Sequence, residues 1–379
     1  MSTSKRRVTF VVSGLTPTLG LERVTLNLVQ ALEQRLDIRI IVLGGSNADK
    51  NLARGVEVLG TPLRGWQRVQ SFARLYSCSR RNDLGTVVLV GVWTAVPWLL
   101  VAPRLPGGTI IWEHTLLKEK LPYSKPLSVL KFMTRYLYRR ADKVVAVSQP
   151  VAEDMEEYGN IRRVTVIPNI VKEPTTESVE KIVKSRNTEH RILSIGSLTT
   201  IKAQHLALEA LSILDDQYSL TVIGDGPRMT ELSALAKSLG IEERVRFTGY
   251  LDQPSVKKEL SKASVLLHCS VAETFGLVYA EAADAFVPVV SVDTRVARYM
   301  IPKYSPGWLS EATPEALAKT IREMPRSAPF PTEAFIEASQ RRGVDFGVDR
   351  VIGDWLNILT NTTPETSEQA ATKVAKGNA

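Results

Sequence analysis

The feature that most constrains the fold of this chain is a repeated alternation between short apolar runs and longer amphipathic segments. In the first half, the amphipathic segments predicted as helices are Leu21–Glu33, Trp66–Arg80, Leu127–Arg140 and Gln149–Tyr158. The apolar runs predicted as strands are Val8–Ser13, Ile38–Leu43, Val56–Leu59, Val87–Val92, Thr109–Glu113, Lys143–Val147 and Val164–Ile167. Apolar strands joined by helices are typical of a parallel sheet covered on both faces.

The same alternation resumes after a polar, charged segment and predicts a second domain. Its strands are expected at Ile192–Ile195, Leu220–Ile223, Val245–Thr248, Ser264–His268 and Pro288–Val292. Its helices are expected at Ile201–Leu214, Arg228–Leu239, Ser255–Lys262, Gly276–Ala285, Pro314–Met324, Thr332–Gln340 and Val348–Leu359. Because parallel sheets of this kind bind ligands at the carboxyl ends of their strands, the two sheets can face one cleft.

The predicted organisation is an α/β protein with two Rossmann-like domains in 379 residues. The N-terminal domain is expected to span residues 1–171, the linker 172–189 and the C-terminal domain 190–345. A C-terminal helix at 346–360 can pack back on the N-terminal domain. The tail, residues 361–379, has few apolar side chains and is predicted to be disordered.

The excess basic charge of the chain lies in its N-terminal half. Residues 1–172 contain 25 Lys and Arg against 13 Asp and Glu, whereas residues 173–379 contain 23 against 27. This asymmetry indicates an anionic partner for the first half: a membrane surface, a nucleic acid or a phosphorylated substrate. The uncharged stretch Leu84–Ala102 is long enough to cross a bilayer, but its glycines and Pro97 favour a buried strand, a turn and a short helix.

Cysteine and histidine usage argues against a disulfide framework and against a zinc site. Cys78 and Cys269 are far apart in sequence, and the four histidines do not cluster. The apolar run near the N-terminus is too short for a signal peptide, so the cytoplasm is the expected location. From this cysteine and histidine usage we expect neither a metal nor another cofactor.

Two glutamates, Glu273 and Glu281, flank a predicted strand-to-helix turn. A strand is expected to end near His268 and a helix to begin near Phe275, so the free N–H groups of that helix start form an anion site suited to a diphosphate. Both glutamates can face the cleft, one beside each end of a bound nucleotide-sugar. Taken alone, two surface glutamates near a helix start explain the pattern better.

Further candidate residues follow other predicted strands. Gly196 and Lys202 come after the first strand of the second domain, and Gly224 comes after the next one. In the first half, Gly20 and His114 stand in equivalent positions. Each has an ordinary structural explanation, as a turn glycine, a solvated lysine or a core histidine. A lysine at a helix start is slightly unfavourable, however, which favours a phosphate-binding role for Lys202.

Together and in this order, these segments resemble the family 4 retaining glycosyltransferases with the GT-B fold. The resemblance covers roughly residues 7–360. The segment from Glu273 to Ala282 is similar to that family's E-x7-E motif, and Gly224-Asp225-Gly226-Pro227 is similar to its GDGP turn. Val145-Ala146-Val147-Ser148 and Ile167-Pro168-Asn169 resemble the strand-ending serine and the Pro-Asn segment before the interdomain linker.

The resemblance implies an enzyme that moves a hexosyl or N-acetylhexosaminyl group with retention and without a metal ion. The donor would be a nucleoside diphosphate sugar, most commonly a UDP-sugar. The acceptor would be a hydroxyl of a saccharide or a lipid-linked molecule, as in bacterial glycan or glycolipid synthesis. In place of a metal, a helix N-terminus and basic side chains would stabilise the leaving group.

The same resemblance implies roles for individual residues. Glu281 would hydrogen-bond the ribose, Lys202 would contact the diphosphate, and Glu273 and His114 would lie beside the donor sugar as catalytic residues. Backbone close to the donor would come from Gly20, Gly196, Gly224, Phe275, Gly276 and Leu277.

The chain departs from the family pattern at one expected cation and at one glycine pair. Ser197 stands where the family usually has an arginine that pairs with the diphosphate, and Leu19-Gly20 replaces a Gly-Gly pair. Arg295, which follows the strand Pro288–Val292, is a candidate replacement for the missing cation.

A basic stripe is predicted along the helix Leu127–Arg140 and just beyond it. Its members recur every four residues: Lys131, Arg135, Arg139 and Lys143. With Phe132 and Tyr136 nearby, the stripe suits a helix lying on an anionic membrane surface about as well as a solvated helix face. The basic N-terminal half favours the membrane, so peripheral association with its inner face is expected. No nucleic-acid module occurs, and no nucleic-acid partner is expected.

A second class of function stays open alongside the enzyme. The departures at Ser197 and Leu19-Gly20 favour a non-catalytic glycosyltransferase-like subunit that binds a nucleotide or scaffolds a partner enzyme. The retained Glu273 and Glu281 oppose it. A sugar phosphorylase on the same fold is disfavoured, because it needs a pyridoxal phosphate lysine site and a longer chain.

Overall fold

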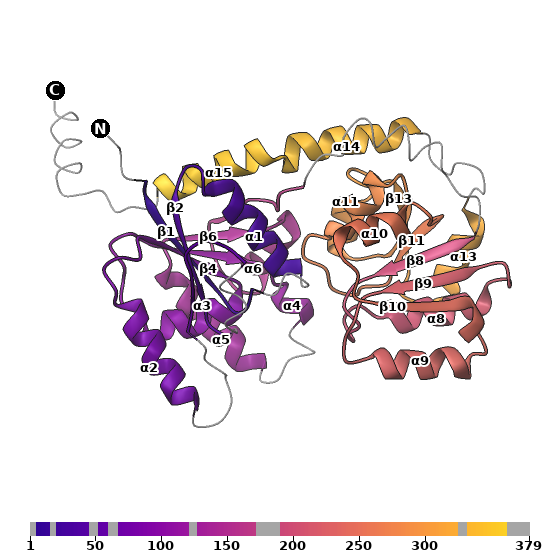
Figure 1. The fold of residues 1–379 in the computed structure, drawn as a ribbon, viewed down its shortest axis with the longest axis horizontal. Helices are drawn as coiled ribbons and strands as arrows, with labels where there is room; N and C mark the ends of the chain where they lie inside the picture. The colour runs from indigo at the N-terminus through magenta and orange to yellow at the C-terminus, as the bar shows by residue number, and fades with distance from the viewer. Residues whose placement is uncertain are drawn as a thin grey trace.

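The computed structural model describes residues 5–15, 20–44, 52–59, 67–120, 127–171, 190–324 and 332–361. Within these ranges the chain forms two α/β domains that lie side by side, with two consecutive helices running along the top of both (Figure 1). The predicted linker, residues 172–189, and residues 362–379 of the predicted tail lie outside the described residues.

The N-terminal domain contains a sheet of seven parallel strands in the order β3-β2-β1-β4-β5-β6-β7. Their bounds are β1 (Arg7–Val12), β2 (Asp37–Val42), β3 (Val56–Val58), β4 (Thr86–Val90), β5 (Thr109–Glu113), β6 (Lys143–Ala146) and β7 (Val164–Val166). The central strands β4 and β5 are buried at every position, as a sheet covered on both faces requires. The strand order reverses between β1 and β4, the place where such sheets form ligand sites.

The helices of this domain are α1 (Gly20–Leu32), α2 (Gln67–Ser79), α3 (Val92–Val101), α4 (Leu117–Lys120), α5 (Leu127–Leu137) and α6 (Gln149–Glu157). Helix α3 packs against α2 on one side and α5 on the other. The predicted strand Val87–Val92 ends two residues too late, because the backbone turns at Gly91 (φ 76°) and α3 begins at Val92. No helix among the described residues has both the length and the apolar character needed to cross a membrane.

The C-terminal domain contains six parallel strands in the order β10-β9-β8-β11-β12-β13. Their bounds are β8 (Arg191–Ile195), β9 (Ser219–Ile223), β10 (Val245–Gly249), β11 (Val265–His268), β12 (Val289–Val292) and β13 (Gly307–Ser310). The helices are α8 (Gln204–Ile213), α9 (Met229–Ser238), α10 (Gln253–Leu260), α11 (Leu277–Asp284), α12 (Arg295–Met300) and α13 (Pro314–Glu323). The strand order reverses between β8 and β11, so a second ligand edge faces the first domain.

The two predicted Rossmann-like parallel-sheet domains are confirmed. All twelve predicted strands exist within one or two residues of their expected ends. The strands between the sheet edges are apolar on both faces, which fits the interior of such a sheet, and the edge strands β3, β7 and β10 are only partly buried. The edge strand β13 and the short helix α12 are not predicted. Strand β13 has the sequence Gly-Trp-Leu-Ser, which contains no β-branched residue and only two large apolar ones, so it lacks the apolar run that marks the other strands.

The last two helices join the domains. Helix α14 (Thr332–Phe346) continues six residues beyond the predicted end and packs on α11 of the C-terminal domain. Helix α15 (Val348–Thr360) then lies on the N-terminal domain beside α1 (Figure 1). Trp355 of α15 is fully buried, with its ring edge-on to Trp112 of β5 at 5.2 Å between centroids. The end of the chain therefore stabilises the domain that its beginning forms.

Candidate active site

A cleft of about 1100 Å³ opens between the two sheets, at the carboxyl ends of their strands. Both domains line it, the first through the start of α1 and the ends of β4 and β5, the second through the ends of β8, β9 and β11 and the start of α11. The structure brings together on this cleft all ten residues predicted as catalytic or donor-binding: Gly20, His114, Gly196, Lys202, Gly224, Glu273, Phe275, Gly276, Leu277 and Glu281. Their individual roles stay predictions.

The start of α11 is shaped by a glycine that no other residue can replace without strain. Gly276 has a left-handed backbone (φ 75°), and a Cβ built there would come within 2.3 Å of the Tyr279 ring. The preceding Phe275 is buried against Phe346 of α14, with 5.1 Å between ring centroids. These contacts fix the first turn of α11, which begins at the edge of the cleft.

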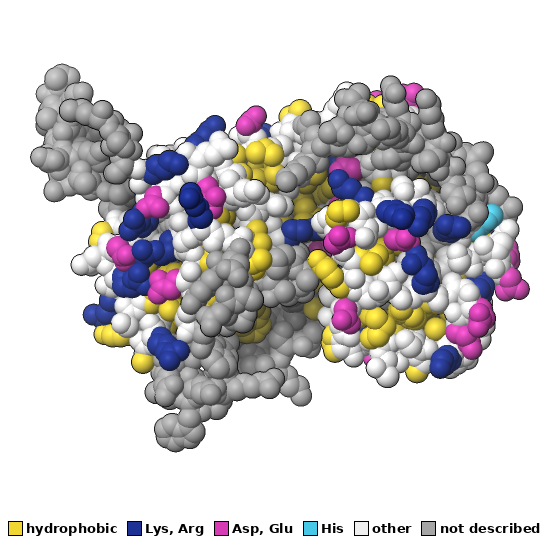
Figure 2. Space-filling view, in the orientation of Figure 1, with side chains coloured by type: hydrophobic (Ala, Val, Ile, Leu, Met, Phe, Trp, Pro, Cys, Tyr) yellow, Lys and Arg dark blue, Asp and Glu magenta, His cyan; other side chains and the backbone are white. Residues whose placement is uncertain are grey.

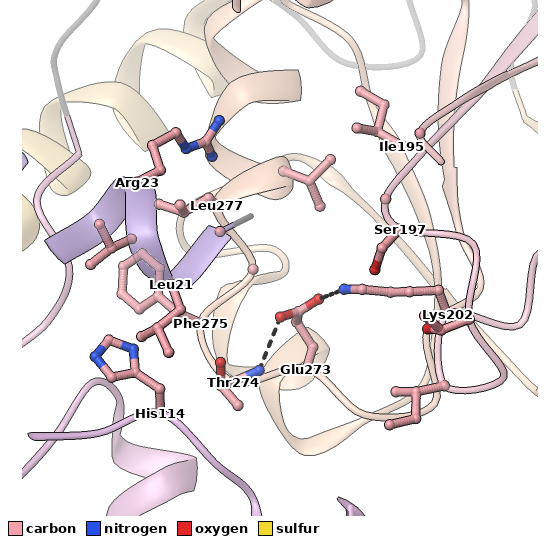
Figure 3. Close-up of a pocket in the computed structure, with 18 of the residues that line it drawn as sticks. Leu21, Arg23, His114, Ile195, Ser197, Lys202, Glu273, Thr274, Phe275 and Leu277 are labelled. Atoms are coloured by element: carbon pink, nitrogen blue, oxygen red, sulfur yellow. Dashed lines mark hydrogen bonds and ion pairs between the residues drawn. The ribbon is translucent and has the colours of Figure 1, made fainter. Parts of the chain in front are cut away.

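Glu273 is the centre of a compact charged cluster. Its Oε2 lies 2.5 Å from Lys202 Nζ, and its Oε1 accepts a hydrogen bond from the Thr274 N–H at 3.1 Å (Figure 3). The same Oε2 lies 3.4 Å from His268 Nε2. Burial by itself raises the pKa of Glu273, but the Lys202 ammonium and His268 outweigh burial and hold the pKa well below its usual range. The carboxylate is therefore ionised.

His268 ends β11 and is almost completely buried beneath Glu273. Burial lowers the pKa of His268, and this effect outweighs the nearby carboxylate, so the imidazole is neutral at physiological pH. Its ring packs edge-on to Tyr279 of α11 at 5.1 Å. Sequence reasoning used His268 only to mark the end of a strand, because its proximity to Glu273 depends on how the following loop turns back.

Glu281 forms an ion pair with the other domain. Arg23, in the first turn of α1, places Nη2 2.8 Å from Glu281 Oε1, and both side chains are about a quarter exposed. In Figure 3, Arg23 extends from α1 toward the α11 side of the cleft. Arg23 was not among the predicted site residues. The sequence feature that could have identified it is its position in the first turn of the helix that follows the first strand.

The glycine turns at the ends of β8 and β9 pack against each other. Gly224 has φ 136°, and a Cβ there would come within 2.0 Å of the Gly196 carbonyl oxygen. Because no side chain fits between the two turns, their backbones approach closely beside the cleft. Gln204 then donates to the Ser197 carbonyl at 3.1 Å, which holds the segment leading to Lys202.

His114 lines the cleft from the N-terminal domain, directly after β5 (Figure 3). Its ring packs edge-on against Trp112 at 4.4 Å, and its backbone N–H donates to Glu113 Oε1 at 2.9 Å. Glu113 is fully buried and accepts a hydrogen bond from the Tyr138 hydroxyl. This buried network orients the loop that carries His114.

Arg295 does not supply the missing cation of the cleft. Its Nη2 pairs with Glu157 Oε2 of α6 at 2.9 Å, and it does not line the cleft. The prediction fails because α12 turns the side chain toward the neighbouring domain. Ser148 forms a second contact between the domains, since its hydroxyl donates to the Thr274 carbonyl at 2.6 Å.

The predicted basic stripe is partly wrong. Helix α5 ends at Leu137, a 3-10 turn covers Tyr138–Arg140, and Lys143 is the first residue of β6, so Lys143 cannot continue a stripe on the helix. Arg135 and Arg139 are exposed, as is Lys143, whereas the Lys131 side chain lies outside the described residues. On the face shown in Figure 2, basic side chains are frequent over the N-terminal domain and acidic ones are interspersed among them.

Two family models match consecutive parts of the chain. The model described as Glycosyltransferase Family 4 matches residues 19–173, and the model described as Glycosyl transferases group 1 matches residues 175–341. Within the described residues, no group of three or more His, Cys, Asp or Glu side chains is arranged to hold a metal ion.

Known proteins are similar to this chain over almost its whole length. An uncharacterized glycosyltransferase of Haemophilus influenzae is 22% identical over 375 residues, which is 93% of this chain and 100% of that protein. A Campylobacter jejuni enzyme named GalNAc-alpha-(1->4)-GalNAc-alpha-(1->3)-diNAcBac-PP-undecaprenol alpha-1,4-N-acetyl-D-galactosaminyltransferase is 25% identical over 372 residues, 93% of this chain and 98% of its own. The crystal structure of Anabaena HepE in complex with UDP and glucose matches with a TM-score of 0.77 at 18% identity, covering 94% of this chain and 100% of HepE. The chain thus belongs to the family 4 glycosyltransferases with the GT-B fold.

Proposed function

We propose that this glycosyltransferase transfers a hexosyl or N-acetylhexosaminyl group from a UDP-sugar, with retention and without a metal ion. The observation that carries the proposal is the arrangement of Lys202, Glu273 and Glu281 around the start of α11. Glu281 lies four residues into α11 after Leu277, which is about 6 Å along the helix axis. That spacing lets one ligand reach both Glu281 and the N–H groups of the first turn.

Each part of the cleft suits one part of such a donor. The first turn of α11 and Lys202 can bind the diphosphate, since a helix N-terminus and an ammonium both attract anions. Glu281 can accept hydrogen bonds from the ribose hydroxyls. Glu273, held ionised by Lys202, can lie beside the sugar and oppose the positive charge that develops on it. His114 faces this region from the acceptor-side domain.

The acceptor we propose is a hydroxyl of a saccharide or of a lipid-linked saccharide. The Campylobacter jejuni relative carries an undecaprenol diphosphate saccharide in its name, and it aligns over 93% of this chain. HepE was crystallised with UDP and glucose, which supports a UDP-linked donor for a chain with the same fold.

Binding and transfer can be tested together. In a thermal-shift screen of UDP, GDP and their sugars, UDP at about 100 times its Kd should raise the Tm by about 3 °C. Hydrolysis of UDP-sugars, followed in excess chelator, should continue, because α11 and Lys202 replace a metal. Stabilisation by no nucleoside diphosphate would contradict the proposal, as would loss of activity in chelator that Mg²⁺ restores. Binding of UDP without turnover would favour the non-catalytic subunit.

We further propose that the N-terminal domain binds anionic membranes through α5 and the 3-10 turn that follows it, Tyr138–Arg140. Phe132 and Tyr136 are each more than 60% exposed, with ring centroids 5.0 Å apart, and Arg135 and Arg139 are exposed beside them. Paired exposed aromatics next to basic side chains suit the headgroup region of a bilayer. This surface would bring a lipid-linked acceptor to the domain that carries His114.

Liposome sedimentation tests the membrane proposal. The double variant Arg135→Glu, Arg139→Glu should bind anionic vesicles at least about tenfold more weakly, since each basic residue contributes on the order of 1 kcal/mol near such a surface. The matched control is Lys257→Glu, Lys258→Glu, which reverses two exposed charges on α10 of the other domain and should leave binding unchanged. A wild-type protein that ignores anionic vesicles at low salt would favour a soluble acceptor.

A further inference from the structure

The cleft holds fewer available cations than its proposed ligand requires. Among the described residues that line it, the basic side chains are Arg23 and Lys202, and the carboxylates are Asp225, Glu273 and Glu281. Lys202 is paired with Glu273 at 2.5 Å and Arg23 with Glu281 at 2.8 Å. A nucleoside diphosphate adds further negative charge, so its entry must change at least one of these pairs.

The Arg23 pair is the one that a nucleotide would open. A ribose that reaches Glu281 replaces the guanidinium N–H donors of Arg23 with two hydroxyl donors. Those hydroxyls satisfy the carboxylate oxygens, but they carry no charge, so they leave Arg23 without a counter-ion. The diphosphate of the same ligand would then be the nearest anion for Arg23, since Glu281 lies about 6 Å along α11 from its first turn.

The chemistry of arginine fits this exchange. A guanidinium has five N–H donors in a planar fork and binds phosphate oxygens as readily as carboxylates. Arg23 is anchored on α1, whose first turn borders the cleft, and its side chain is 27% exposed, so it can change partners without unfolding the helix. Arg295, which also joins the two domains through an ion pair, contacts Glu157 outside the cleft.

We propose that Arg23 leaves Glu281 when the donor binds and pairs with its diphosphate, so that the N-terminal domain supplies the second cation of the leaving-group site. The inference rests on the proposed function, because it assumes a nucleoside diphosphate donor. Arg23 is then a positioning residue in the empty cleft and a direct ligand of the donor when the cleft is filled. Donor binding would also strengthen the contact between the two domains, since Arg23 of the N-terminal domain and Lys202 of the C-terminal domain would bind the same diphosphate.

Affinities for uridine and for UDP separate this role from the alternatives. We would measure both by isothermal titration calorimetry, uridine by displacement, on the wild type, Arg23→Gln, Arg23→Lys and Arg295→Gln. Arg23→Gln should weaken UDP binding about 10- to 100-fold, because a charge-assisted contact to phosphate is lost. Uridine affinity should stay equal or rise, because Glu281 no longer has a charged competitor. Arg23→Lys retains the charge and should restore most of the UDP affinity.

The control and the contrary outcomes are distinct. Arg295→Gln removes a different ion pair between the domains and should leave both affinities unchanged; an equal loss of UDP affinity there would assign the effect to domain contact and overturn the proposal. Equal losses for uridine and UDP in Arg23→Gln would mean that Arg23 only orients Glu281. Equal gains in affinity for uridine and UDP would mean that Arg23 only competes with the nucleotide for Glu281. Unchanged affinities would mean that Arg23 takes no part in binding, and either result overturns the proposal. If the wild type binds neither ligand, the proposed function itself fails.

Discussion

Replacing Glu273 with Gln is expected to lower kcat about 10²- to 10³-fold while UDP affinity stays equal or rises, because Lys202 no longer has a charged competitor for the diphosphate. The amide has nearly the shape of the carboxylate but no charge, so the variant loses the electrostatic stabilisation of the developing positive sugar, which is worth roughly 3–4 kcal/mol for one well-placed group. UDP contains no sugar to be transferred, so its affinity does not report that interaction. Steady-state turnover of the donor and calorimetry with UDP measure the two effects.

A carboxylate with similar surroundings provides the control for Glu273. Glu259 of α10 has a side chain 14% exposed, against 15% for Glu273, and it pairs with both Arg246 and Lys262. It does not line the cleft. Glu259→Gln should therefore keep the wild-type kcat. A Glu273→Gln enzyme with near wild-type kcat would remove Glu273 from the chemistry and leave it only a structural partner of Lys202.

Replacing Lys202 with Ala is expected to weaken UDP binding about 10- to 100-fold and to lower the free energy of unfolding by about 2 kcal/mol at pH 7. The first effect is the loss of a charged ligand of the diphosphate. The second arises because Glu273 is left in a largely buried position without its closest cation, and uncompensated buried charge is costly. Calorimetry with UDP and urea unfolding monitored by circular dichroism measure the two effects.

The stability effect of Lys202→Ala should depend on pH in a defined direction. In the wild type, the pKa of Glu273 lies below its unfolded value of about 4.3, so the stabilisation is present above that pH and is lost as the pH falls through the folded pKa. Without Lys202, burial moves the pKa of Glu273 upward. The free energy of unfolding of the variant is therefore lowered most at neutral pH, and it recovers as the Glu273 carboxylate becomes protonated. The difference in the free energy of unfolding between the wild type and Lys202→Ala should therefore shrink from pH 7 toward pH 4.

A surface pair serves as the control for Lys202. Lys262, in the turn just after α10, has its Nζ 3.0 Å from Glu259 Oε1, and its side chain is 42% exposed. Exposed pairs of this kind contribute little, so Lys262→Ala should change the free energy of unfolding by less than about 0.5 kcal/mol with no marked pH dependence. If the difference in the free energy of unfolding between the wild type and Lys202→Ala stays constant from pH 7 to pH 4, the ion pair of Lys202 with Glu273 is contradicted.

The strands and the edge at which ligands bind could be predicted because their signals are local. An apolar run such as Thr109–Glu113 can be satisfied only inside a sheet covered on both faces, and parallel strands place their carboxyl ends together. Residues that follow those ends, such as Lys202 and His114, therefore reach one cleft without any knowledge of their contacts. The edge strand β13 gave no such signal, because its four residues, Gly-Trp-Leu-Ser, do not form a continuous apolar run.

The wrong predictions, for the basic stripe and for Arg295, concern features that local sequence signals do not determine. The spacing of Arg135, Arg139 and Lys143 predicts one stripe, but the helix ends at Leu137 and the last of them begins a strand. A period of four residues does not reveal where a helix stops when no glycine or proline marks its end. Arg295 was predicted to be a cation of the cleft because its sequence position follows a strand, yet its side chain binds Glu157 of the other domain.

Local sequence patterns were enough to predict two parallel sheets with ligand edges at the carboxyl ends of their strands, and the loops that line the space between them. Which charges face each other in that space, Lys202 with Glu273 and Arg23 of one domain with Glu281 of the other, became known from the folded chain alone. The physical reason is that burial and backbone periodicity act within a few residues of the chain. Ion pairs instead depend on distances of about 3 Å between groups far apart in sequence, and these distances exist only once both domains have folded and docked.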